Sequence, residues 1–175
     1  MFYIYSTMQL NISIFVGIIH VGGMMIVNTY GFIVSQHDLL DRIYMVGFLS
    51  IPFSWILCKD ECIISYLVKK YENRHYILGS DSANVDDIVD LFPSKQCYNY
   101  GFYPINHGLR VYSLFLVNER TTLIGTRLFS PMILLYSLYT FDITYSTNYS
   151  RSFYPYFHIF LGLTLFSCMA ASLFR

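Results

Sequence analysis

The stretch LNISIFVGIIHVGGMMIVNTYGFIV, residues 10–34, decides the fold. No Asp, Glu, Lys or Arg occurs between Met1 and His37. A helix needs about 20 predominantly apolar residues to cross the hydrocarbon core of a bilayer. This uncharged run is long enough, and it predicts a first membrane-spanning helix over 10–34.

The composition of the whole chain is that of a membrane protein. Of its 175 residues, 55% are apolar and 13% are charged, whereas a soluble domain has roughly 45 to 50% apolar and about 25% charged residues. The 11 basic and 11 acidic residues give a formal net charge of zero, so the basic surface of a nucleic-acid-binding protein is absent. We expect the lipid bilayer and other protein subunits as partners, and no nucleic acid.

Further apolar segments predict further spans. Residues 43–58 and 152–174 contain no charged residue and predict two more spanning helices. The region 108–141 contains either one long helix or two short ones joined at Asn118. We favour one span over 121–139, with Arg127 reaching the interface, because an unpaired Arg at the bilayer centre is costly. The predicted fold is an all-α, polytopic transmembrane helical bundle of four spans, or five if 108–141 adds a crossing.

Residues 59–120 form the predicted aqueous loop, which holds most of the Lys and Asp residues. Apolar residues at helical spacing predict a short amphipathic helix after Asp60, and an acidic start at 84–87 predicts a second one that stops at Pro93. Apolar side chains in and beside this loop are the candidates for contact with another subunit. They are Trp55, Ile63, Leu67, Tyr71, Ile88 and Phe92.

Four spans would place both termini and the 59–120 loop on one side of the membrane. Nine of the basic residues then lie on that side, including Arg127, and two, Arg42 and Arg151, lie on the other. Positively charged loops stay on the cytoplasmic side. We therefore expect both termini to face the cytosol, or the matrix in an organelle.

Two cysteines form the densest cluster that could carry chemistry. Cys58 and Cys62 are four residues apart, so their side chains would share one face if the helix continued through them. Two thiolates at this spacing can bind a metal, with Cys97, His75 or His107 as a further ligand, or act as a redox pair. Packing cysteines are the favoured interpretation, and we expect no catalytic residues and no cofactor. His20 and His158, inside predicted spans, are expected to be neutral and hydrogen-bonded between helices.

The segments SWILCKDECIISYLVKK (54–70) and YILGSD (76–81) resemble a region of small multi-spanning membrane proteins from large nucleocytoplasmic DNA viruses. In those proteins a span ends at a Trp, and an acidic and cysteine-containing element opens a helix that paired lysines close. The resemblance implies a viral membrane component located beneath a capsid.

The expected function is therefore that of a non-catalytic integral membrane subunit in a larger assembly. A virion membrane or minor structural protein, in the virion inner membrane or a host endomembrane, is favoured. An accessory subunit of an energy-transducing complex in an organelle inner membrane is one alternative. A small channel or transporter is another, and a thiol enzyme using Cys58 and Cys62 is a third.

Overall fold

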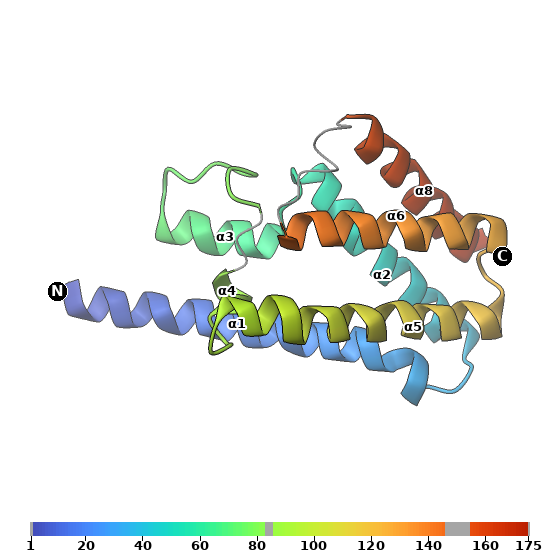
Figure 1. Cartoon of the computed structure of the whole chain (residues 1–175), viewed down its shortest axis with the longest axis horizontal. Helices are drawn as coiled ribbons and strands as arrows, with labels where there is room; N and C mark the ends of the chain where they lie inside the picture. Colours follow the sequence, from blue (N-terminus) through green and yellow to red (C-terminus); the bar gives the residue numbers. More distant parts are fainter. Residues whose placement is uncertain (1, 83–85, 146–154, 175) are drawn as a thin grey trace.

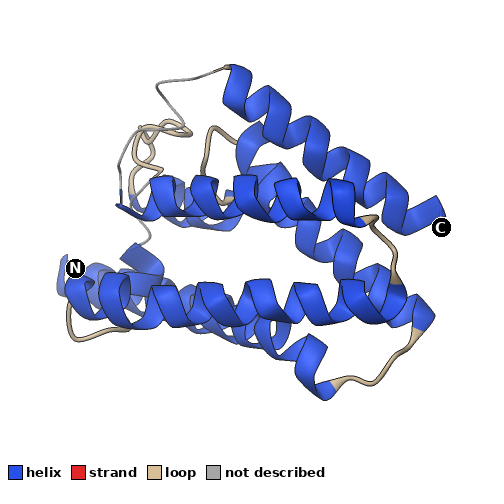
Figure 2. Ribbon diagram, turned by 45° about the vertical axis from the view of Figure 1, so that its right-hand side comes forward, coloured by secondary structure: helices blue, strands red, loops and turns tan. Residues whose placement is uncertain are grey.

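A computed structural model describes the backbone of residues 2–82, 86–145 and 155–174, and the side chains of residues 14–82, 88–145 and 155–174. All regular structure in these ranges is helical (Figure 2), which confirms the predicted all-α class. Five helices have 19 residues or more: α1 Phe2–Ile33, α2 Asp38–Leu57, α5 Tyr103–Thr121, α6 Thr126–Tyr145 and α8 Tyr156–Phe174. The shorter elements are α3 Ile63–Glu72, α4 Asp86–Val89 and the π-helix η1 Cys97–Phe102.

The five long helices alternate in direction along the chain (Figure 1). α1, α5 and α6 follow the long axis of the molecule, and α2 and α8 cross them obliquely. We call the end of the bundle where α1 begins the N-end, and the end where α8 finishes the C-end. The α1–α2 and α5–α6 connections lie at the C-end, whereas α3 and the start of α5 lie at the N-end.

Side-chain caps determine where the helices turn at the C-end. His37 is the N-cap of α2 and accepts a hydrogen bond from the amide of Leu40 at 3.3 Å. The C-cap residue of α5 is Thr122, which has a left-handed backbone with φ 51°. Asn118 then closes the turn by bonding both the N–H and the C=O of Ile124, at 2.9 and 3.0 Å. Of the two alternatives for 108–141, the structure contains two helices that separate just after Asn118.

The hydrophobic core lies where α2, α5, α6 and α8 meet. α2 packs against α8, and α1 packs along α5. Phe48 of α2 meets the ring of Tyr136 of α6 edge-on, with centroids 5.4 Å apart. Fully buried side chains fill the space between the helices, among them Met45, Leu49, Leu114, Met132, Leu161 and Leu165. Deleting one such side chain typically costs about 2–5 kcal/mol.

Gly31 allows α1 and α5 to approach closely. A Cβ atom at Gly31 would lie 2.5 Å from the carbonyl oxygen of Ser113. The Gly31 amide donates to Ser113 Oγ at 2.9 Å, and the Tyr44 hydroxyl lies 3.0 Å from the same oxygen. Three helices therefore meet at one serine, and they can meet there because residue 31 has no side chain.

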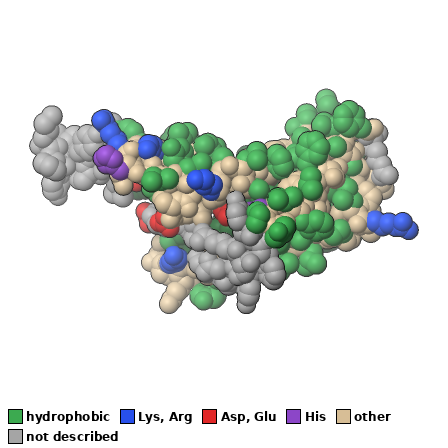
Figure 3. All heavy atoms as spheres, turned by 90° about the horizontal axis from the view of Figure 1, so that it is seen from above, with side chains coloured by type: hydrophobic (Ala, Val, Ile, Leu, Met, Phe, Trp, Pro, Cys, Tyr) green, Lys and Arg blue, Asp and Glu red, His purple; other side chains and the backbone are tan. Residues whose placement is uncertain are grey.

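Three helices are long and apolar enough to cross a membrane in the part of the chain that the structure describes. They comprise Ile14–Ile33, Asp38–Leu57 and Tyr156–Phe174. Figure 3 shows hydrophobic side chains over one half of the visible face and most of its charged side chains over the other half. The chain is thus a helical protein with three candidate spans, as expected for 10–34, 43–58 and most of 152–174; residues 152–154 lie outside the described ranges.

Two predicted boundaries differ from the structure. The predicted span over 121–139 is not among the three candidates; the helix in this region, α6, starts later, at Thr126, and contains Arg127 and Asp142. The predicted aqueous loop over 59–120 contains the 19-residue helix α5, which packs along α1 and buries Leu114 and Val117. Much of this loop therefore belongs to the bundle.

This helix order also changes the distribution of charge. The described basic residues near the N-end are Lys59, Lys69, Lys70, Arg74 and Lys95, those near the C-end are Arg42, Arg120 and Arg127, and Arg110 lies within α5. The strong bias expected for four spans is reduced. Moreover, α1 begins and α8 finishes at opposite ends of the bundle (Figure 1). This order does not support the expectation that both termini lie on one side of the membrane, which stays a prediction.

Candidate functional site

The five residues from Cys58 to Cys62, here called the junction segment, connect α2 to α3 at the N-end. The amides of Cys58 and Asp60 both donate to the carbonyl of Trp55, at 3.0 and 2.7 Å, and this ends α2. Lys59 and Asp60 have left-handed backbones, with φ of 55° and 66°. Such a conformation costs a non-glycine residue about 1–3 kcal/mol. Contacts made by the following side chains must compensate for it.

Asp60 connects the junction segment to two long helices. Its Oδ1 accepts a hydrogen bond from the Tyr139 hydroxyl of α6 at 2.7 Å, and it lies 2.9 Å from Nε2 of His158 in α8. His158 is buried, and its ring packs edge-on against Tyr139 with centroids 5.8 Å apart. One carboxylate therefore holds the second half of α6 and the start of α8 together.

Glu61 organises the segment that follows α3. Only 1% of its surface is exposed, and its Oε1 lies 2.9 Å from Nζ of Lys69. The same oxygen accepts from the Tyr76 hydroxyl at 2.7 Å, and Oε2 accepts from the amide of Gly79 at 2.9 Å. Lys69 also donates to the carbonyl of Asp81 at 2.8 Å. A buried charge is tolerated when it is paired and hydrogen-bonded in this way.

Gly79 is required where this segment passes the junction. Its φ is +80°, and a Cβ atom there would lie 2.6 Å from Cβ of Lys59. Glycine adopts this conformation without steric cost. The residues 73–82 can therefore pass directly over the left-handed turn at Lys59.

Cys62 connects the junction segment to α1. It is the N-cap residue of α3, and its Sγ lies 3.7 Å from Nε2 of His20. Burial raises the pKa of the thiol, but the contact with His20 and the backbone amides of Ser65 and Ile64 outweigh burial and leave the pKa below its usual value. A thiol beside an imidazole at the amino end of a helix is the arrangement that favours the nucleophilic thiolate.

A second polar cluster lies between the helices in the middle of the bundle. Arg110 of α5 donates to Oδ1 of Asn28 in α1 at 3.2 Å and to the Tyr136 hydroxyl of α6 at 3.0 Å. Asn28 also bonds Asn106. Nearby, His107 lies 3.1 Å from Oγ of Ser137. These contacts turn the polar face of α5 inward.

A third cluster closes the C-end. Asp41 is fully buried and receives a two-pronged contact from Arg120, whose Nε lies 3.1 Å from Oδ2 and whose Nη2 bonds Oδ1. The Tyr30 hydroxyl donates to the same carboxylate at 2.9 Å. Arg120 also donates to the carbonyl of Val34 just beyond α1. A single ion pair thus joins α1, α2 and α5.

The predicted cysteine pair does not share a helix face. Because α2 ends at Leu57 and a left-handed turn follows, Cys58 caps α2 whereas Cys62 caps α3. Cys97 is exposed in η1, and His107 contacts α6. In the described part of the chain no three His, Cys, Asp or Glu residues lie together in a way that could hold a metal ion.

The six candidate interface residues fall into two groups. Ile63, Leu67 and Tyr71 are 46%, 58% and 52% exposed, so they form one apolar face of α3. The other three contact the chain itself. Trp55 packs against the core, Ile88 is buried, and Phe92 packs on Phe102 and Tyr98 with ring centroids 4.7 and 5.5 Å apart.

Sequence reasoning missed the Asp60 to His158 contact. Asp60 follows the second span along the chain, and nothing in the local pattern predicts that a left-handed turn brings it to α8.

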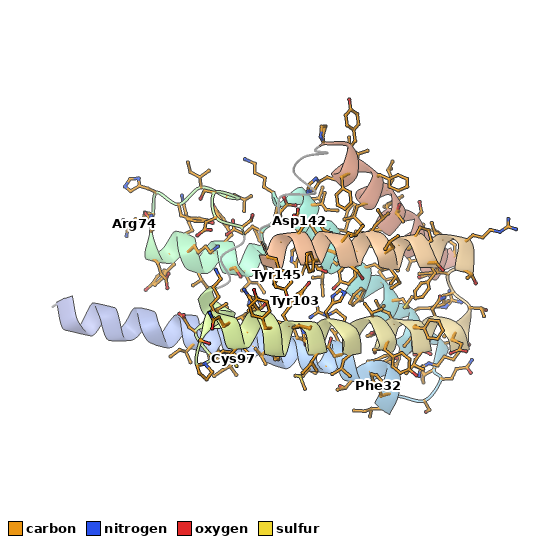
Figure 4. All side chains as sticks on the ribbon, in the orientation of Figure 1. Phe32, Arg74, Cys97, Tyr103, Asp142 and Tyr145 are labelled. Carbon is orange, nitrogen blue, oxygen red and sulfur yellow. The ribbon has the colours of Figure 1, made fainter. Side chains whose placement is uncertain are left out.

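In α5 and α6, the sequence contains a clearer sign of residues that face other helices. Charged residues isolated in apolar surroundings, such as Arg110 and Asp142, commonly face a bundle interior. Figure 4 shows Asp142, Tyr145 and Tyr103 where the end of α6 meets the start of α5. There the Tyr145 hydroxyl donates to the carbonyl of Asn99 at 2.7 Å.

Comparison with known proteins identifies no relative. No protein-family model, no curated protein and no solved structure matches the chain. The resemblance of residues 54–81 to viral membrane proteins therefore stays a prediction.

Proposed function

We propose that all five long helices cross the bilayer and that the protein is a non-catalytic membrane subunit of a larger assembly. The observation that carries the membrane arrangement is the polarity of α5. Its outward side chains are apolar and exposed, namely Ile105, Leu109, Tyr112 and Phe115. Its inward side chains include Asn106, Arg110 and Ser113. A helix with its apolar face outward is suited to lipid rather than water.

The same reasoning applies to α6. Leu134, Leu138 and Phe141 are exposed on its outer surface, whereas Tyr136 and Thr140 face the other helices. Mean hydropathy underestimates how well α5 and α6 suit a membrane. It counts their inward polar residues as if they faced lipid, although other helices provide hydrogen-bond partners for these residues. Lengths of 19 and 20 residues match the thickness of a bilayer.

Spin labels placed one at a time along α5 test this arrangement. In vesicles, we expect collisions with dissolved oxygen to peak at 105, 109, 112 and 115 and to be lowest at 106, 113 and 117. Oxygen concentrates in lipid, whereas a water-soluble paramagnetic complex does not. Peaks for the water-soluble complex on the outer face of α5 would show that the helix lies in water, and the five-span arrangement would fail.

The subunit role is supported by the exposed apolar face of α3, which follows the second candidate span. Ile63, Leu67 and Tyr71 lie outside the three candidate spans. An apolar face of this kind suits contact with another subunit. The assembly that we propose is a virion membrane, for which the support is the resemblance of residues 54–81, and an accessory role in an organellar complex is the alternative.

Native gel electrophoresis after mild solubilisation from the native membrane tests the subunit role. We expect the protein to migrate in a species larger than its own mass. Leu67→Asp should release it, because a charge on the apolar face opposes burial. Arg74→Ala, at an exposed position that points away from the bundle (Figure 4), is the control and should leave the larger species intact. Migration as a free monomer before any substitution would contradict the role.

A small anion channel is the second candidate, and the Arg110 cluster favours it. Both hydrogen-bond partners of this partly buried guanidinium, Asn28 and Tyr136, are uncharged. Intramembrane cations of this kind often mark ion pathways. Chloride flux in liposomes should then fall in Arg110→Gln and persist in Arg127→Gln. Absence of flux in the unsubstituted protein would dismiss this candidate.

A further inference from the structure

The four cysteines occupy four different environments. Cys168 is buried in α8, and Cys97 is exposed in η1. Cys58 caps the carboxyl end of α2, where the helix dipole disfavours a thiolate, and Cys62 caps the amino end of α3, where the dipole favours one. Sγ of Cys62 also lies 3.7 Å from the imidazole Nε2 of His20.

The sulfur of Cys62 lies near one boundary of the candidate spans. The preceding span ends at Leu57, five residues before Cys62 in the chain. Leu57 is 70% exposed and Ile63 is 46% exposed, so apolar surface flanks the thiol on both sides in the chain. Cys62 itself is partly exposed. An apolar reagent arriving from the bilayer would therefore meet this thiol at the membrane boundary.

We propose that Cys62 is an S-acylation site that accepts a long-chain fatty acyl group from an acyl thioester. Two independent features support this proposal: the contact between Cys62 and His20, and the apolar surface at the level where an attached chain would enter the hydrocarbon core. Cysteines beside membrane spans commonly carry such chains. Acylation of Cys62 does not require another subunit, so this proposal does not depend on the proposed subunit role.

The transfer is balanced without an oxidant or reductant. Nε2 of His20 accepts the proton of the thiol, and Sγ of Cys62 attacks the carbonyl carbon of the donor thioester. A new carbon–sulfur bond forms at Cys62, and the carbon–sulfur bond of the donor breaks. The donor thiolate leaves and takes the proton back from His20. One thioester is exchanged for another, and a free thiol is released.

The test uses the full chain in phosphatidylcholine vesicles with palmitoyl-coenzyme A as the donor. Mass spectrometry locates the acyl group, and hydroxylamine sensitivity identifies the thioester. We expect the group on Cys62 of the unsubstituted protein, which requires no variant. Cys62→Ser should remove it, Cys97→Ser should retain it, and His20→Gln should slow its attachment about 10²-fold, the scale of general-base assistance.

A second readout separates reactivity from a structural role. Alkylation by iodoacetamide, followed against pH, should reach half its maximal rate at Cys62 at a pH below the ordinary thiol pKa. His20→Gln should move the Cys62 midpoint towards the ordinary thiol value of about 8.5. The proposal is overturned if the acyl group attaches to Cys97 but not to Cys62, if Cys62 stays unmodified, or if His20→Gln changes neither rate nor midpoint.

Discussion

The two ends of the bundle are held together by different chemistry. At the C-end, a fully buried aspartate and an arginine join α1, α2 and α5, which are three of the long helices. At the N-end, Asp60, Glu61 and Cys62 each hold a different part of the chain through Tyr, His, Lys and backbone groups. The C-end therefore depends on one pair of opposite charges between long helices, whereas the N-end depends on several separate contacts to different segments.

We therefore expect the C-end contacts to determine the stability of the whole bundle, and the N-end contacts to determine the local attachment of α3 and residues 73–82. A break in the C-end pair should weaken the whole bundle, because two of the three helices that it joins, α2 and α5, contribute to the core. A break at the N-end should release α3 and residues 73–82 first, because these segments depend on Glu61 for their attachment.

Arg120→Leu should have the largest effect. It leaves Asp41 as a buried charge with its ionic partner removed, and breaking a buried pair in this way costs about 3–5 kcal/mol. Reversible unfolding in mixed micelles measures the change. Arg127→Leu, at an exposed position at the start of α6, is the matched control and should stay within about 0.5 kcal/mol of the unsubstituted protein. Equal stability of the two variants would contradict the claim that the Arg120–Asp41 pair stabilises the bundle.

Glu61→Gln should rank second and act locally. The substitution removes the charge that Lys69 pairs with and weakens two further hydrogen bonds, and bonds to a charged group are worth about 1.5–3 kcal/mol each. Limited proteolysis should therefore cut residues 73–82 faster. Asp90→Asn changes an exposed acid and should leave the cleavage rate as it was. If Glu61→Gln lowered global stability as much as Arg120→Leu, the two ends would not differ as described.

Gly31→Ala should have the next largest effect. The added methyl group would meet the carbonyl oxygen of Ser113 at 2.5 Å, so α1 and α5 must move apart. Overpacking of this kind costs about 1–3 kcal/mol. Gly22→Ala, where nothing lies within 4 Å of the new methyl group, should be neutral or slightly stabilising because Ala favours the helix. Unfolding midpoints of the two variants measure the contrast, and coincident midpoints would contradict the close approach.

The smallest effect concerns alkaline pH. Burial lowers the pKa of Lys69, but Glu61 and Tyr76 outweigh burial and leave it above its usual value. A raised pKa in the folded state means that the contribution of Lys69 to stability is fully present below the unfolded value of about 10.4 and is lost as the pH rises through the folded value. Cleavage within 73–82 should accelerate there, and Glu61→Gln should flatten the dependence. If the contribution of Lys69 were lost as the pH falls instead, the claim that folding raises the pKa of Lys69 would be wrong.

The sequence predicts the first, second and last long helices well because each contains a long run without charge. The sequence places most of α5 in the aqueous loop, because the charged residues Glu119 and Arg120 separate the apolar runs of 108–141 and a single span over 121–139 leaves the preceding segment outside the membrane. Two polar residues that this interpretation leaves in the loop are Asn106 and Arg110. Those residues bond Asn28 and Tyr136 inside the bundle, and the sequence gives no direct sign of such partners. The sequence pattern shows that one face of a helix is polar. It does not show whether that face contacts other helices inside the bundle or contacts water.

The junction segment shows a second limit. Its charged and thiol residues stood out as a cluster, yet the partners of Asp60 and Cys62 lie 98 and 42 residues away in the sequence. The left-handed backbone at Lys59 and Asp60 determines which helices these side chains reach, and neither residue type predicts that conformation. The apolar spacing predicts the short helix α3, and the structure places its N-cap at Cys62.

The arrangement of the five helices across the bilayer is tested most directly by locating both ends of the bundle. Single cysteines at Arg74, near the N-end, and at Gly125, near the C-end, can be introduced into a cysteine-free variant in sealed vesicles and labelled with a membrane-impermeant maleimide. An odd number of crossings predicts that tags on the two termini lie on opposite sides, with Arg74→Cys on the side of the N-terminal tag and Gly125→Cys on the side of the C-terminal tag. Both tags on one side would contradict the five-span arrangement.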